Sequence, residues 1–175
     1  MTKKKIYWMV LPLIFIILLV VIYQFAWNNT KKTVEIFDIS NSKQFIRESP
    51  TEAVDNLLNE KEGIYYFGFD RCPWCQELLP IFETVLKGKG QTSYAVDTKS
   101  KEFTDTAKYR LKQFYSRYQK GEFTVPFIVI ISKSKRVWTH IGTLRGHDAT
   151  VSKLTAEQKK RLINSLNNLL SNIQK

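Results

Sequence analysis

Both cysteines of this 175-residue chain lie in one short stretch, "DRCPWCQ", at residues 70–76. Cys72 and Cys75 are separated only by Pro73 and Trp74. Two cysteines at this spacing can form a redox-active pair, half of a metal site or a structural disulfide. The choice between these depends on the elements that hold them.

The pair is predicted to lie between a buried strand and a helix. Residues 64–69 form a continuous apolar run, and the residues after the cysteines predict a helix that ends at Gly88 or Gly90. The start of a helix carries unpaired N–H groups that stabilise a thiolate. We therefore expect Cys72 to be the exposed nucleophile and Cys75, one turn inward, to be the shielded resolving thiol.

The neighbours of Cys72 support a reactive thiol. Arg71 adds a full positive charge next to it, and both Arg71 and Pro73 are expected to favour the thiolate. Pro73 suits the first helical turn because its missing N–H costs nothing there. Trp74 is expected to be an exposed aromatic side chain at the edge of the site.

The pair has three other possible interpretations. A structural disulfide would close a loop of only four residues and would remove little entropy from the unfolded chain. A zinc site would need His140 and His147 as further ligands, and their spacing exceeds the usual separation of about three to five residues. The third alternative is two buried, inert thiols. The helix start and Arg71 favour the redox-active pair, and we expect neither a metal nor a cofactor.

The rest of the chain predicts an α/β fold. The order β-α-β-α-β-α-β-β-α predicts a mixed sheet with helices on both faces and a hairpin near the end. The predicted strands cover residues 34–39, 64–69, 93–97, 126–132 and 136–143, and the predicted helices cover residues 51–63, 76–90, 101–121 and 154–173. Capping boxes are expected at Ser49 with Glu52 and at Thr155 with Gln158.

A proline opens the predicted central strand in "TVP", residues 124–126. Pro126 is a candidate for a cis peptide bond, which is a specific device of tight turns. The alternative is a trans proline at the start of a strand, which is also allowed.

A strand, C-x-x-C at a helix start, a further helix and "TVP" opening a strand together resemble the thioredoxin superfamily over about residues 34–174. Pro80, five residues after Cys75, matches a helix-kinking proline of many of these proteins. The resemblance implies a thioredoxin-like fold in which Cys72 attacks and Cys75 resolves.

The resemblance also implies a substrate-binding loop. Thr124, Val125 and Pro126 would form the cis-proline loop, and Val125 would pair its backbone with an extended peptide. Trp74 is expected to contribute to the same binding surface.

The chain departs from the thioredoxin pattern at three points. Arg71 replaces the usual tryptophan, and Pro73 and Trp74 replace Gly-Pro. Tyr66 stands where a buried carboxylate is often found, so the proton relay for Cys75 is missing or differently built. A proline directly after the first cysteine, with Val125 before the cis proline, is more similar to thiol oxidases and glutaredoxins.

Residues 6–27 predict a single transmembrane anchor. These 22 residues carry no charge and would span roughly 33 Å as a helix. A cleaved signal peptide would have a shorter apolar stretch and a small-residue cleavage site. The positive charges in residues 1–5 favour a cytoplasmic N-terminus, so residues 34–175, after a polar tether at 28–33, would face outward, where thiols can be oxidised.

Composition and charge fit a globular domain beside a membrane. Hydrophobic residues make up 43% and charged residues 25% of the chain. The net charge is +11, and three of these charges lie before the predicted anchor, which leaves +8 outside it. A basic face is attracted to an anionic membrane, and no nucleic-acid-binding motif accompanies the charge, so we expect a lipid partner and no nucleic acid.

The layout of a short, basic, anchored chain with "FGFDRCPWCQ" also resembles the bacteriocin transport accessory proteins. The implied function is a thiol–disulfide oxidoreductase that helps secreted peptides, such as bacteriocins, to acquire disulfides, together with an unidentified redox partner. One alternative is a reductase fed by an electron donor in the membrane. The other is a non-catalytic module that binds a transporter or peptide.

Overall fold

The computed structural model describes Val20 and residues 39–174. Residues 39–174 belong to one compact unit, Ile36–Lys175. Its elements are, in chain order, η1 (Ile39–Asn41), β1 (Phe45–Arg47), α2 (Pro50–Leu58), β2 (Gly63–Gly68), α3 (Pro73–Gly88), β3 (Ser93–Asp97), α4 (Asp105–Tyr118), β4 (Phe127–Ile131), β5 (Val137–Ile141) and α5 (Ala156–Leu170).

The five strands form one mixed sheet in the order β1-β3-β2-β4-β5. Strands β1, β3 and β2 are parallel, whereas β4 is antiparallel to β2, and β5 forms an antiparallel pair with β4. The mixed sheet and the hairpin predicted from the sequence are confirmed. Strand β2 lies at the centre of the sheet, so the residues that follow it emerge from the interior of the domain.

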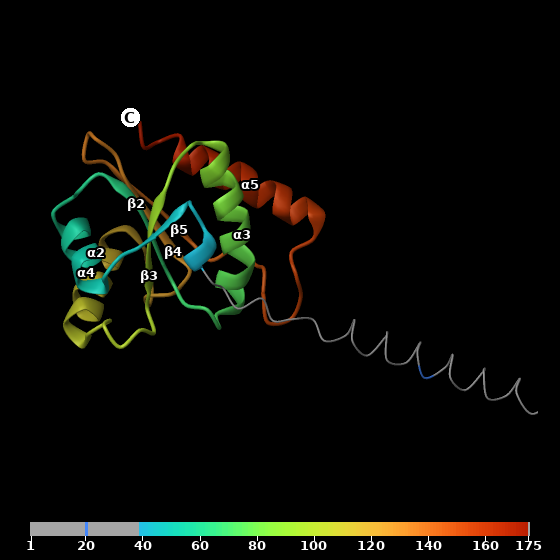
Figure 1. The fold of residues 1–175 in the computed structure, drawn as a ribbon, viewed down its shortest axis with the longest axis horizontal. Helices are drawn as coiled ribbons and strands as arrows, with labels where there is room; N and C mark the ends of the chain where they lie inside the picture. Colours follow the sequence, from blue (N-terminus) through green and yellow to red (C-terminus); the bar gives the residue numbers. More distant parts are fainter. Residues whose placement is uncertain (1–19, 21–38, 175) are drawn as a thin grey trace, which may run out of the picture. The chain divides into compact units, whose positions relative to one another are not determined.

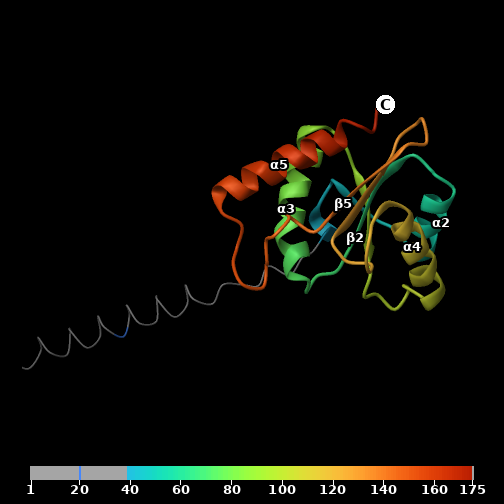
Figure 2. The same ribbon diagram turned by 180° about the vertical axis from the view of Figure 1, so that it is seen from behind.

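Two helices cover each face of the sheet, as predicted. Helices α3 and α5 lie on one side and α2 and α4 on the other, and both pairs are visible from opposite directions (Figures 1 and 2). Side chains alternate between the two layers along β2. Ile64 and Tyr66 pack in the α3–α5 layer, whereas Tyr65 and Phe67 pack in the α2–α4 layer.

Side-chain caps fix where the helices begin. The hydroxyl of Thr155 and the amide of Gln158 form the predicted capping box at α5. At α2, the Ser49 hydroxyl accepts a hydrogen bond from the backbone of Glu52. Helix α4 is shorter than the predicted 101–121, because the Thr104 side chain accepts from the backbone of Ala107 and caps a helix that begins at residue 105.

The first predicted strand is wrong where the structure describes it. Ile39 begins the short 3-10 helix η1, and residues 34–38 lie outside the described residues. The first strand in the described residues is β1, which pairs Phe45 with Ser93 at the edge of the sheet.

The described helices include none that is both long and apolar enough to cross a bilayer. Apart from Val20, the anchor predicted over 6–27 lies outside the described residues.

Gly68, the last residue of β2, makes room for the ring of Tyr66. A Cβ added at Gly68 would lie 2.7 Å from Cζ of Tyr66 and closer still to its hydroxyl oxygen. The two residues are two apart on one strand and therefore share a face of the sheet. Any larger residue at this position would force the tyrosine ring to move.

Gly68→Ala is expected to lower the free energy of unfolding by about 1–3 kcal/mol, because the added methyl group would clash with the buried ring of Tyr66. The measurement is urea unfolding of the whole chain followed by tryptophan fluorescence. Gly88→Ala is the matched control, since a Cβ there meets no atom within 4 Å. Equal stability of the Gly68→Ala variant and the wild type would contradict the close contact.

Candidate functional site

The two cysteines lie at the junction of β2 and α3. Cys72 is the N-cap of α3, with an extended backbone, and its sulfur accepts a hydrogen bond from the backbone N–H of Cys75 at 3.3 Å. Pro73 occupies the first helical position, as expected from its missing donor. Both cysteines are free thiols. Both sulfurs therefore lie at the N-terminus of α3.

The burial of Cys72 differs from the prediction of an exposed nucleophile. Cys72 is 3% exposed and Cys75 is fully buried. Cys72 is the more exposed of the two thiols, as predicted, but almost all of its surface is covered. Cys72 is buried because it lies against the loop of the same chain that precedes β4.

The two thiols have opposite protonation preferences. A hydrogen bond from the Cys75 thiol, assisted by the N–H groups of Cys75 and Trp74 and opposed by burial, lowers the pKa of Cys72 to about 7. The same bond, together with burial, raises the pKa of Cys75. At neutral pH a substantial fraction of Cys72 is therefore thiolate, while Cys75 keeps its proton.

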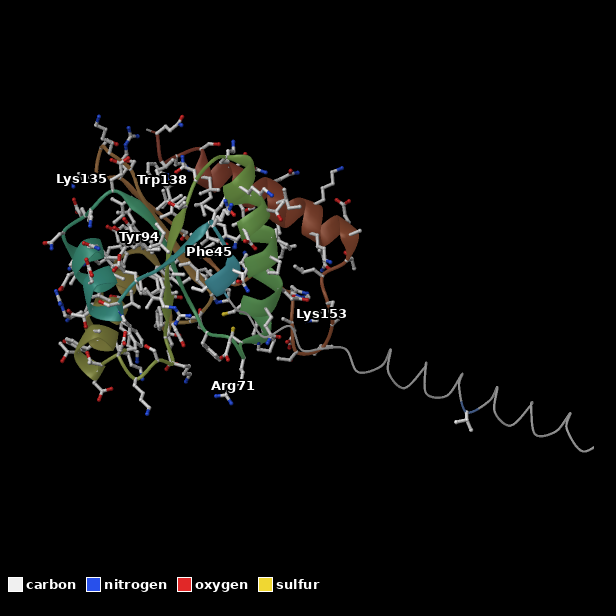
Figure 3. The ribbon with its side chains drawn as sticks, viewed as in Figure 1. Phe45, Arg71, Tyr94, Lys135, Trp138 and Lys153 are labelled. Atoms are coloured by element: carbon white, nitrogen blue, oxygen red, sulfur yellow. The ribbon has the colours of Figure 1, made fainter. Side chains whose placement is uncertain are left out.

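Arg71 contributes less than the sequence suggests. Its side chain is exposed and points away from the domain at the turn before α3 (Figure 3). The groups that lower the pKa of Cys72 are Cys75 and Trp74, and Arg71 is not among them. The prediction that Arg71 tunes the thiolate is therefore not supported by this geometry. Arg71 places a positive charge at the rim of the site.

The cis-proline loop lies directly against Cys72. The sulfur of Cys72 is 3.9 Å from the carbonyl oxygen of Val125, to which the thiol form can donate a hydrogen bond. The Val125–Pro126 peptide bond is cis. Thr124 is exposed, and its hydroxyl lies 3.5 Å from that of Tyr115. The two motifs, 53 residues apart in sequence, thus meet at one point.

Trp74 is partly buried, unlike the exposed aromatic expected from the sequence. Its indole N–H donates a hydrogen bond to the carbonyl of His147 at 3.3 Å. This bond attaches the first turn of α3 to the loop between β5 and α5. Trp74 is therefore held in place by the protein itself.

A buried pair that sequence reasoning missed holds that loop. His147 Nε2 lies 2.6 Å from one carboxylate oxygen of Glu77, and the other oxygen accepts from the backbone of Leu154 at 3.0 Å. The side chains of Glu77 and His147 are only 5% and 3% exposed. The sequence analysis names His147 only as a possible zinc ligand. The pair could not be recognised there because 70 residues separate His147 from Glu77.

The other candidate ligand, His140, lies on β5 and is partly buried, and burial lowers its pKa. Within residues 39–174, no three His, Cys, Asp or Glu side chains gather as a metal site.

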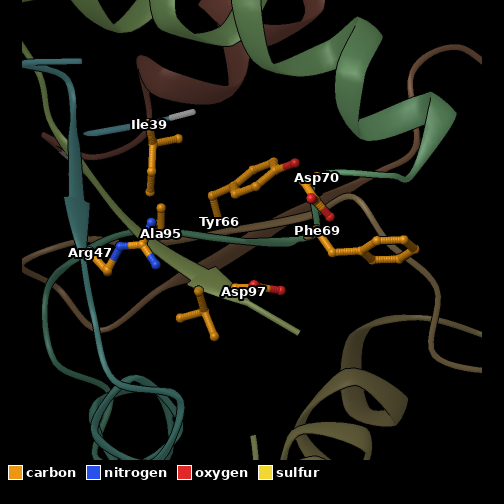
Figure 4. Close-up of a pocket in the computed structure, with 9 residues that line it drawn as sticks. Ile39, Arg47, Tyr66, Phe69, Asp70, Ala95 and Asp97 are labelled. Atoms are coloured by element: carbon orange, nitrogen blue, oxygen red, sulfur yellow. The ribbon is translucent and has the colours of Figure 1, made fainter. Parts of the chain in front are cut away.

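Tyr66 occupies the position beneath Cys75. Burial, followed by the influence of the neighbouring Cys75 thiol, raises the pKa of Tyr66 well above its ordinary value. Tyr66 also lines a cavity of about 50 Å³, together with Arg47, Asp70 and Asp97 (Figure 4). A cavity of this size with charged side chains in its wall has room for water.

A search with protein-family models finds no match to this chain, and no curated protein matches it.

The rate of alkylation of Cys72 by iodoacetamide is expected to rise with pH through a midpoint near 7, because the thiolate is the nucleophile. The measurement is the pH dependence of labelling at Cys72, read by mass spectrometry of the reduced whole chain.

Two substitutions at position 75 test whether the Cys75 side chain causes the low pKa of Cys72. Cys75→Ser keeps a hydrogen-bond donor and should leave the midpoint near 7, whereas Cys75→Ala should raise it towards the value of an ordinary thiol, about 8.5. A midpoint that is the same in both variants would refute the role of the Cys75 side chain.

Proposed function

We propose that this chain is a thiol–disulfide oxidoreductase with a thioredoxin-like fold, acting through Cys72 and Cys75. The observation that carries the proposal is the pairing of a low-pKa thiol at a helix start with a buried, protonated partner one turn inward. The cis-proline loop beside Cys72 and the order of strands in the sheet are further support.

The proposed reaction transfers two electrons from a substrate dithiol to the pair. A substrate thiolate attacks Sγ of Cys72 in the Cys72–Cys75 disulfide, and Cys75 leaves as a thiolate and takes up a proton. A second substrate thiolate then attacks the substrate sulfur of the mixed disulfide. Cys72 leaves as a thiolate, and the substrate holds the new disulfide. A partner that carries a disulfide, or another thiol oxidant, must then reoxidise the pair.

The low pKa of Cys72 favours this direction. A thiol of low pKa is a good leaving group, so the second attack is assisted by the hydrogen bonds that stabilise the Cys72 thiolate. Stabilising the reduced form also makes a pair more oxidising. The proposal therefore assigns the chain to disulfide formation rather than to reduction.

The proposed location is the outer face of a membrane. The uncharged residues 6–27 and the charges of residues 1–5 support an anchor with a cytoplasmic N-terminus. Secreted peptides that contain cysteines, bacteriocins included, are the proposed substrates, in line with the resemblance of the layout to the bacteriocin transport accessory proteins.

Tyr66 is proposed to relay the proton of Cys75. Because its pKa is raised, the phenol stays neutral and passes a proton by giving up its own while accepting another. The cavity lined by Asp70 and Asp97 supplies or receives that proton. Gly68 supports the relay, since its missing side chain leaves room for the tyrosine ring.

Tyr66→Phe is expected to slow the step that uses Cys75 by about 100-fold, because the relay is lost. The measurement is the release of a peptide thiol from its mixed disulfide with Cys72 in the reduced protein, followed by rapid quenching. The pH midpoint of Cys72 alkylation should stay near 7, since Tyr66 does not contribute to it.

Tyr65→Phe is the matched control. It removes the hydroxyl of the preceding residue on β2, which faces the other layer and donates to the carbonyl of Lys61. An equal loss of rate in both variants would show a general loss of packing instead of a relay.

Turnover of a dithiol peptide tests the proposed function. The oxidised whole chain should form one peptide disulfide for each Cys72–Cys75 disulfide consumed, and Cys72→Ser should be inactive. Reduced Cys75→Ser should accumulate a mixed disulfide at Cys72 when it is given a peptide disulfide, located by mass spectrometry. Activity of the Cys72→Ser variant equal to that of the wild type would rule out the proposal.

A further inference from the structure

A groove of about 230 Å³ runs beside the cis-proline loop. It is bounded by the segments after β2 and β3, by α4 and by the segment that leads into β4. Three aromatic rings and three lysines line it, namely Phe69, Phe103, Phe123, Lys99, Lys108 and Lys112. Pockets that bury a small-molecule ligand measure roughly 300–1,000 Å³, so this groove has room for side chains of a peptide rather than for a cofactor.

The groove and the reactive sulfur of Cys72 have Val125 as a common neighbour. Val125 lines the groove, and the carbonyl oxygen of Val125 lies 3.9 Å from Sγ of Cys72. A substrate whose cysteine meets Cys72 must therefore place the residues on one side of that cysteine over the groove. An extended chain advances about 3.3 Å per residue, so the groove receives the residues nearest to the reacting cysteine.

The chemistry of the groove is aromatic and cationic. Its three phenylalanines are partly buried, and its three lysines are exposed. Lys99 Nζ lies 5.5 Å from the centre of the Phe69 ring, which keeps its charge over the groove. In the described part of the chain, none of the three lysines forms a salt bridge with a carboxylate, and no acidic residue lines the groove.

We propose that this groove selects substrates in which acidic and aromatic or aliphatic residues flank the reacting cysteine. The apolar side chain enters between the phenylalanines, and the carboxylate pairs with the lysines. The complementary charge raises the encounter rate, whereas a lysine-rich flank is repelled. This inference rests on the proposed function, because it places the substrate cysteine at Cys72.

The test uses two peptides with one cysteine each, flanked by Phe and Asp or by Phe and Lys. Each cysteine is activated as a mixed disulfide with thionitrobenzoate. In the Cys75→Ser variant of the whole chain, the Cys72 thiolate attacks the peptide sulfur, a Cys72–peptide disulfide forms and thionitrobenzoate leaves as a coloured thiolate. The second-order rate constant is the measurement, and it does not depend on the direction of the proposed reaction.

The acidic peptide is expected to react about 10-fold faster than the basic peptide at low salt, and the difference should vanish near 1 M salt, where the Debye length falls to about 3 Å. Replacing Lys99, Lys108 and Lys112 by Gln should abolish the preference. Lys108→Glu with Lys112→Glu should reverse it, so a loss of preference through misfolding is distinguished from a loss of charge.

The control replaces three exposed lysines elsewhere by Gln, namely Lys133, Lys159 and Lys160. This variant has the same net charge as the triple groove variant and should keep the preference. Equal rates for the two peptides, or an equal loss of preference in the control, would overturn the inference while the proposed function stands. No reaction of either peptide at Cys72 would instead contradict the proposed function.

Discussion

The hydrogen bond between the Cys75 thiol and the sulfur of Cys72 sets the chemistry of this site. It lowers the pKa of one thiol and raises that of the other, so a single proton is shared unequally between two sulfurs. An isolated helix N-terminus would favour both thiolates in some measure. Because burial opposes charge on each sulfur, only one negative charge is stabilised, and it lies on Cys72, the sulfur nearer to solvent.

The rest of the domain keeps this bond in place. The central strand β2 ends at Gly68, whose missing side chain leaves Tyr66 beneath Cys75. The first turn of α3 is attached to the loop before α5 through Trp74 and His147, and Glu77 holds that loop by its buried carboxylate. Strand β2 and the loop before α5 thus fix the position of the helical turn that carries the two reactive sulfurs.

Local signals predicted the strand, the helix and the hairpin around the site, because apolar runs, caps and prolines act over a few residues. The strand β1 was missed, since three residues at a sheet edge show no alternation that could be recognised. The burial of Cys72, the Glu77–His147 pair and the groove were missed for another reason. Each depends on segments far apart in the sequence, such as the loop that places Val125 against Cys72. In the sequence, Tyr66 is visible only as a departure from the thioredoxin pattern. The proposed relay role also depends on the packing of its ring against Gly68.

The reduction potential of the Cys72–Cys75 pair decides whether this domain oxidises thiols. Equilibration of the whole chain with glutathione buffers, read by alkylation and mass spectrometry, gives its value. We predict a reversible disulfide with a potential between about −120 and −180 mV, as in proteins that oxidise or isomerise substrates. A value near −270 mV would contradict the oxidising direction, and a potential below about −300 mV would mark a structural disulfide and contradict the redox function itself.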